Sequence, residues 1–295
     1  MKSGVIIINK EEGVTSHTVV AKTKRLLGAS KAGHTGTLDP MATGVLPVLL
    51  ERGVKASEFM LTEDKHYRAT LTLGIETDTE DITGEVIATC SSIPAEDEVI
   101  RAQASFVGKY LQTPPMFSAL KVGGKKLYEL AREGKTIERE PREVEIYSID
   151  CERLSDKDYS LDVHCSKGTY IRTLCADIGK ALGCGGVMST LKRASASGFT
   201  LEDAHTLGEL ENMSPEEREA CIFPVEYIFK NKKNIVLPDF FAKLAKAGQQ
   251  IYLSKIKTDL PLGEKVRLSD KEGFFALGEV RDFDGEAAIK PIRQF

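Results

Sequence analysis

Residues 31–48 read KAGHTGTLDPMATGVLPV, and this stretch carries more information about the fold and the function than any other part of the chain. Asp39 is its one acidic residue, and Gly33, Gly36 and Gly44 lie around it. Glycine lets a backbone turn sharply and approach a ligand closely, so a lone carboxylate on this loop is a candidate catalytic group. An Asp-Pro dipeptide is also common in ordinary turns, and the residue types alone leave both interpretations open.

The full string closely resembles the signature of the TruB family of tRNA pseudouridine synthases. The resemblance continues in the family's order through INKEEGVTSHTVV at 8–20, HYRATLTLG at 66–74, QTPPMFSALKVGGKKLYELAREG at 112–134 and KGTYIRTLCADIG at 167–179. It covers most of residues 4–230, and several long strings in order are far more specific than one short motif. One departure is visible: the family usually has proline after the lysine of the first string, whereas Glu11 and Glu12 follow Lys10 here.

The resemblance implies a chain that isomerises uridine 55 in the T loop of tRNA to pseudouridine. The target uridine is flipped out of the loop, its glycosidic bond is broken, and C5 of the base is joined to the sugar. Asp39 matches the family's catalytic aspartate and Arg172 the arginine that pairs with it. By residue type alone, Arg172 could equally be a solvated arginine at a helix end. Attack at the sugar, attack at the base and a glycal route all stay open.

The other residues expected in the site also come from the resemblance. Tyr67, counted with the catalytic residues, matches the tyrosine that stacks on the target base. His34 matches the histidine that fills the space this base vacates, and Lys10 matches a part that contacts or closes over the RNA. Tyr170 matches a further active-site aromatic and Leu191 an apolar packing residue. By residue type, Tyr67, Tyr170 and Leu191 could also be ordinary core residues.

We expect neither a cofactor nor a metal ion. The isomerisation needs no redox change and no energy input, and the sequence has no phosphate-binding loop, no dinucleotide fingerprint and no H-E-x-x-H motif. Its six cysteines include no C-x-x-C pair and have no companion histidines at zinc spacing, which is typical of reduced thiols in a cytoplasmic protein. The apolar run at residues 5–8 is too short for a signal-peptide core or a membrane span.

The formal net charge is −4, but charge is segregated along the chain. Segment 121–142 and the tail 230–295 are net positive, and residues 13–38 contain bases without acids. Residues 69–100 contain acids without lysine or arginine. Phosphate contact requires a local positive field and not a positive total, so tRNA remains a plausible partner. Mixed, solvated faces are the alternative for any one segment.

Length and periodicity predict an α+β protein with two domains. By the resemblance, residues 1–230 form a pseudouridine synthase fold with a mixed central sheet flanked by helices, in which 121–142 is an RNA-contacting insertion. Residues 235–295 form a small β-rich, PUA-like RNA-binding domain. The expected strands are 4–9, 67–73, 159–165, 265–268, 274–280 and 287–293, and the expected helices run from an N-cap at Ser16 to Gly28, over 99–110 and over 171–182.

Two other functions compete with a standalone monomeric synthase that needs no protein partner. The first is an RNA-binding or tRNA-folding protein whose catalysis is secondary or lost. The second is a relative that depends on a guide RNA, although the extended 121–142 segment is more typical of the standalone bacterial type. A glycosidase is less favoured, because the motif contributes one carboxylate and not a flanking pair.

Overall fold

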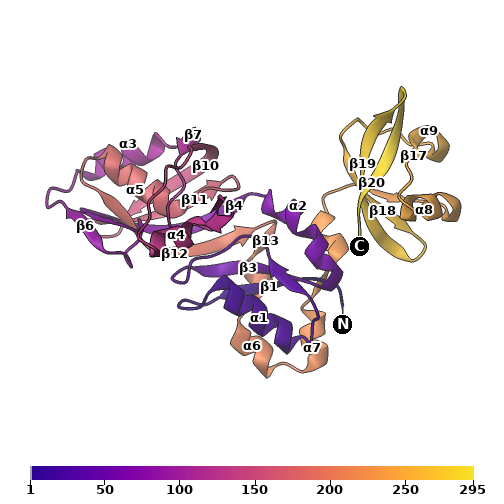
Figure 1. Cartoon of the computed structure of the whole chain (residues 1–295), viewed down its shortest axis with the longest axis horizontal. Helices are drawn as coiled ribbons and strands as arrows, with labels where there is room; N and C mark the ends of the chain where they lie inside the picture. Colours follow the sequence, from indigo (N-terminus) through magenta and orange to yellow (C-terminus); the bar gives the residue numbers. More distant parts are fainter. Residues whose placement is uncertain (1) are drawn as a thin grey trace.

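A computed structural model describes residues 2–295 and shows two lobes (Figure 1). The larger lobe is built on one eleven-stranded sheet. Its main path is β14 (Ala204–His205), β1 (Gly4–Lys10), β3 (Thr43–Leu50), β12 (Gly186–Ala196), β4 (Lys65–Leu73), β11 (Asp158–Cys165), β10 (Arg142–Arg153) and β7 (Gly108–Gln112). β12 pairs parallel with β3 and antiparallel with β4, so the predicted mixed sheet is confirmed. Short strands β2 (Ala32–His34), β13 (Phe199–Thr200) and β15 (Phe223–Pro224) extend it.

Helices cover this sheet at both ends (Figure 1). α5 (Ile171–Ala181) packs on β12 and against α3 (Glu96–Ala104), while α1 (Ser16–Leu26) packs near β3 and against α6 (Leu207–Asn212). α5 turns a stripe of Ile171, Leu174, Cys175 and Ile178 into the main core, as its period predicts. α7 (Pro215–Ala220) follows α6, and α2 (Ser57–Leu61) lies where the two lobes meet in Figure 1.

The strands expected at 4–9, 67–73 and 159–165 and the helix over 171–182 are confirmed. The helix expected over 99–110 is wrong in its second half, because α3 ends at Ala104 and Gly108–Gln112 is an edge strand paired with β10. Gly108 has φ +101°, a conformation that an α-helix cannot contain. The N-cap of α1 is Thr15 and not Ser16. The acidic segment 69–100 contains a hairpin of β5 (Ile75–Thr77) and β6 (Val86–Thr89).

The smaller lobe has its own five-stranded sheet and its own core. The strand order is β16 (Asn234–Val236), β18 (Lys265–Asp270), β19 (Gly273–Phe283), β20 (Glu286–Gln294) and β17 (Ile251–Tyr252). The three strands expected here are confirmed, whereas α8 (Asp239–Lys246) and α9 (Leu253–Ile256) were not predicted. The lobes share a small apolar cluster of Ala56, Val225, Phe229 and Leu277.

Candidate active site

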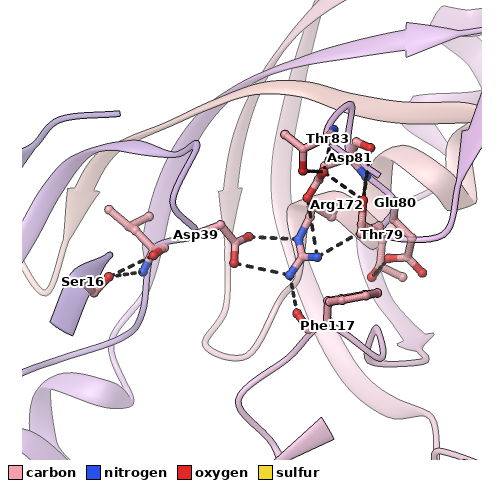
Figure 2. Close-up of polar contacts among 10 residues, drawn as sticks. Ser16, Asp39, Thr79, Glu80, Asp81, Thr83, Phe117 and Arg172 are labelled. Carbon is pink, nitrogen blue, oxygen red and sulfur yellow. Dashed lines mark hydrogen bonds and ion pairs between the residues drawn. The ribbon is translucent and has the colours of Figure 1, made fainter. Parts of the chain in front are cut away.

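The loop of residues 35–42 joins β2 to β3 and is fixed from beneath by α1. The Ser16 hydroxyl accepts the N–H of Leu38 and donates to the Leu38 carbonyl, each at 2.9 Å (Figure 2). Leu38 itself is buried in the main core. Thr15 caps the helix, which leaves the Ser16 side chain free for this second task. The residue next to Leu38, Asp39, is therefore held at a fixed place on the surface of the lobe.

Lys10 fixes the same loop from the end of β1. Its side chain is 1% exposed, and its ammonium donates to the carbonyls of Pro40 at 3.0 Å, Ala42 at 2.5 Å and Glu11 at 3.0 Å. All three protons are directed at main-chain carbonyls, so Lys10 holds the Asp39 loop, and its expected contact with RNA stays a prediction. The turn after Lys10 closes despite the two glutamates, because the Gly13 N–H donates to the Pro40 carbonyl at 2.9 Å.

Asp39 and Arg172, far apart in sequence, meet as a forked ion pair (Figure 2). Arg172 Nε lies 2.9 Å from Asp39 Oδ2, and Nη2 donates to Oδ1 at 3.5 Å. The Asp39 side chain is 33% exposed and that of Arg172 is 6% exposed. This burial rules out a solvated helix-end arginine, because the side chain points inward from the first turn of α5. The carboxylate is thus oriented by a planar donor while one side stays open.

Arg172 is itself held by three further groups (Figure 2). Nη1 donates to the Thr79 carbonyl at 3.0 Å, and Nη2 donates to the Phe117 carbonyl at 2.7 Å. Asp81 Oδ2 lies 3.8 Å from Nη1. The guanidinium therefore joins the Asp39 loop, the acidic hairpin and the segment that precedes the basic insertion.

Asp81 is a second buried carboxylate that the sequence did not single out. Its Oδ1 accepts from the Thr79 hydroxyl at 2.9 Å, from the Thr83 N–H at 2.9 Å and from the Thr83 hydroxyl at 2.6 Å. These bonds stabilise a carboxylate that is 5% exposed beside a cation. The D-x-T spacing is the local signal, but it lies among many other acids.

Burial dominates the electrostatics around Asp39. Burial raises the pKa of the Asp39 carboxyl, Arg172 opposes that rise, and Asp81 adds to it. Burial lowers the pKa of Lys10 to about 8, although the Asp39 charge acts in the opposite direction. The pKa of Asp39 is raised and that of Lys10 is lowered, so the proton affinities of the carboxylate and of the lysine that holds its loop move closer together.

Tyr67 and Leu191 lie on two neighbouring strands of the sheet. Tyr67 on β4 is 7% exposed and Leu191 on β12 is 8% exposed, and both belong to the main core cluster. Burial raises the pKa of Tyr67, Arg193 opposes that rise, and Asp39 adds to it. Tyr67 is therefore both a core residue and within electrostatic reach of Asp39. The sequence did not single out Arg193, whose charge opposes that rise.

His34 and Tyr170 lie at the ends of their elements. His34 closes β2 and is half-buried, and burial lowers its pKa, which favours the neutral ring at pH 7. Tyr170 precedes α5, and the side chain of Gln112 accepts its N–H at 2.8 Å and donates to its carbonyl at 3.0 Å. Burial raises the pKa of the Tyr170 phenol, and Asp39 adds to the rise.

Residues 2–295 contain no group of three or more His, Cys, Asp or Glu side chains arranged to hold a metal ion. All six cysteines are free thiols. In the same range, the longest apolar helix falls short of what a bilayer crossing requires.

Comparisons with known proteins show the family of the chain. The description "TruB family pseudouridylate synthase (N terminal domain)" matches residues 24–171, and "tRNA pseudouridylate synthase B C-terminal domain" matches residues 172–230. The chain is 44% identical to tRNA pseudouridine synthase B of Alkaliphilus oremlandii, over 99% of this chain and 98% of that protein. It is 43% identical to the protein of the same name from Francisella philomiragia, over 94% of this chain and 91% of that protein.

Two solved structures share the fold. One is an H/ACA ribonucleoprotein bound to a substrate RNA containing 2'-deoxyuridine, with a TM-score of 0.73 and 25% identity over 99% of this chain and 84% of that one. The other is a Cbf5-Nop10-Gar1 complex, with a TM-score of 0.71 and 27% identity over 99% of this chain and 84% of that one. Together with the sequence matches, the shared fold shows that the chain belongs to the TruB family of pseudouridylate synthases.

Proposed function

We propose that this protein isomerises uridine 55 in the T loop of tRNA to pseudouridine, with Asp39 as the catalytic carboxylate. The observation that carries the proposal is the forked contact of Asp39 with Arg172 on a loop anchored by Lys10 and Ser16. The fork leaves an oriented carboxylate with an open side, which is what a group acting beside the ribose requires. Family membership supplies the substrate and the reaction.

The reaction conserves every atom of the nucleotide except the base hydrogen on C5. The N1–C1' bond breaks, the base turns, the C5–C1' bond forms, the C5 proton leaves to solvent, and N1 takes up a proton in its place. Asp39 acts at the sugar or the base in its ionised form, and Arg172 favours that form against the effect of burial. Chemistry of this kind uses a placed charge and no cofactor.

The remaining residues are assigned by where they lie around Asp39. Tyr67 stacks on the flipped base, with Leu191 packed beside it, and Tyr170 lines the opposite side at the start of α5. The neutral, flat His34 ring suits the space that the base vacates. Lys10 is assigned a positioning role, because its protons all hold loop carbonyls.

RNA outside the target loop is bound by two basic regions. Segment 121–142 is largely exposed and begins a few residues after Phe117, whose carbonyl binds Arg172. Residues 235–295, with a separate sheet and core, act as a PUA-like RNA-binding domain, and residues 1–230 act as the catalytic domain. The protein works as a monomer on tRNA and needs neither a guide RNA nor a protein partner.

Tritium release tests this proposal. The purified protein is incubated with a T-loop stem-loop labelled with tritium at uridine C5, and without any other protein or RNA. Release that depends on the enzyme supports the proposal. No release from the stem-loop or from full tRNA would refute it. Release that appears only after a guide RNA or partner protein is added would favour a guide-dependent relative.

A further inference from the structure

Arg193 on β12 is a buried cation to which the resemblance assigns no role. Its side chain is 1% exposed and is among the largest fully buried side chains. Within residues 2–295, the hydrogen bonds of its guanidinium go to main-chain carbonyls and none goes to a carboxylate. A buried charge without a counter-ion is costly and persists only where hydrogen bonds or a function compensate for it.

The hydrogen bonds of Arg193 all go to the active site. Nε donates to the Val45 carbonyl at 2.7 Å, and Nη2 donates to the Gly36 carbonyl at 3.2 Å. These two carbonyls lie on either side of Asp39 in sequence, one within the loop and one where β3 leaves it. Arg193 is also the cross-strand partner of Tyr67, and its charge opposes the rise in the pKa of that phenol. One planar group therefore holds both limbs of the catalytic loop and lies beside the stacking tyrosine.

The strand pairing explains how Arg193 reaches all three groups. β12 lies between β3 and β4, and Arg193 is paired with Gly44 on one side and with Tyr67 on the other. Gly44 has φ +101°, and a Cβ atom there would lie 2.3 Å from the Arg193 carbonyl oxygen. Only glycine permits this approach, so residue 44 lets β12 lie close under the loop.

We propose that Arg193 is a positioning residue that holds the Asp39 loop and Tyr67 in register, so that one rigid unit meets the sugar and the base of the same uridine. The proposal rests on the proposed function, because it takes Asp39 as the catalytic carboxylate and Tyr67 as the residue that stacks on the target base. Cross-strand partners present their side chains on the same face of a sheet, so Arg193 and Tyr67 lie next to each other on that face. The opposing effect of Arg193 on the pKa of Tyr67 agrees with this contact.

Arg193→Lys is the direct test, because lysine keeps the charge but cannot hold both carbonyls with one planar fork. We expect the single-turnover rate on the tritiated stem-loop to fall on the order of 100-fold, as for a small misplacement of reacting groups. The dissociation constant of the stem-loop should stay unchanged, because the side chain is buried. Lys192→Met is the matched control, since Lys192 is exposed and is paired with Arg68, not with Tyr67. Wild-type turnover by a folded Arg193→Lys protein overturns the proposal.

A double-mutant cycle separates positioning from a purely structural role. If Arg193 acts through Tyr67, the rate loss in Arg193→Lys/Tyr67→Phe should be clearly smaller than the product of the two single losses. Losses that multiply overturn the link to Tyr67. Should Arg193→Lys not fold by circular dichroism, Tyr67→Phe alone still tests the link. It keeps both carbonyl contacts, and an unchanged single-turnover rate in that variant refutes the proposal.

An NMR measurement that does not depend on catalysis tests this proposal separately from the proposed function. In protein labelled with ¹³C at the tyrosine phenol carbon, the Tyr67 signal is identified by its absence in Tyr67→Phe. It should shift in Arg193→Lys and stay in place in Lys192→Met. Absence of tritium release from the wild type refutes the proposed function alone. An unmoved Tyr67 signal in folded Arg193→Lys refutes the contact itself.

Discussion

Replacing Arg172 by lysine should damage turnover far more than RNA binding. In the wild-type protein, Nε of Arg172 lies 2.9 Å from Asp39 Oδ2, and Nη2 lies 3.5 Å from Oδ1. The guanidinium also donates to the carbonyls of Thr79 and Phe117. Lysine retains the positive charge, but one ammonium on a flexible stem cannot reproduce the fork and both carbonyl contacts. The carboxylate would stay near its place without a fixed orientation.

The expected loss follows from the contacts that disappear. A hydrogen bond to a charged group is worth about 1.5–3 kcal/mol, and Arg172→Lys removes at least one of the two to Asp39. A loss of about 2–3 kcal/mol in transition-state stabilisation corresponds to a rate decrease of roughly 30- to 160-fold. Arg68→Lys is the control, because Arg68 is 70% exposed and is paired with Asp162, away from the site.

The assay is single-turnover tritium release, with stem-loop affinity measured as a function of salt. The reasoning predicts a slow variant with wild-type affinity and wild-type salt dependence. If Arg172→Lys instead keeps its rate, binds more weakly and shows a flatter salt dependence, Arg172 is a phosphate contact and the fork is incidental.

Four further outcomes are expected. Asp39→Asn removes the charge from a nearly isosteric side chain, so turnover should stop while stem-loop affinity stays near wild type; substantial turnover by a pure variant would contradict this. The wild-type rate should fall above pH about 8, because the lowered pKa of Lys10 means that the ammonium loses a proton there and one of the carbonyls it holds loses its donor; Lys10→Met should be slower at all pH values and lack this alkaline limb. Turnover on a prefolded stem-loop should survive excess EDTA, whereas an absolute need for one divalent ion would be a contradiction. Replacing the exposed Lys243 and Lys255 of the smaller lobe by glutamine should weaken binding of full tRNA and flatten its salt dependence, with stem-loop turnover unchanged; unchanged tRNA affinity would argue against RNA binding by that face.

The sequence pattern predicted those strands and helices in which apolar residues recur at a regular spacing. Residues 67–73 and 159–165 alternate cleanly because one face of each strand lies in the core, and both ranges are strands. The helix over 171–182 shows one apolar stripe, and that stripe is buried. The pairing of Asp39 with Arg172 came from family resemblance, since nothing local in the sequence relates residues so far apart.

What escaped prediction depends on tertiary contacts. β12 forms the centre of the sheet, yet irregular register at Met188/Thr190 and at Arg193/Ser195 interrupts its alternation. Lys192 and Arg193 are neighbours of similar chemistry, and only the packing of β3 and β4 around the strand makes one exposed and the other buried. The sequence does not reveal that Lys10 holds the loop, because two of the carbonyls that accept its protons belong to residues thirty or more positions away.

The arrangement of charge explains how a buried carboxylate can remain ionised and still be reactive. Burial and Asp81 both raise the pKa of Asp39, and Arg172 and Lys10 oppose them. A cation that directed all its donors at Asp39 would cancel the charge of the carboxylate. Arg172 instead divides its donors among four groups, which are Asp39, the Thr79 and Phe117 carbonyls and the neighbouring Asp81. Lys10 acts from the far side of the loop through its charge, since its protons are held by carbonyls. Asp39 is thus oriented by one cation and favoured in its ionised form by two, while a third of its side chain stays open to the substrate.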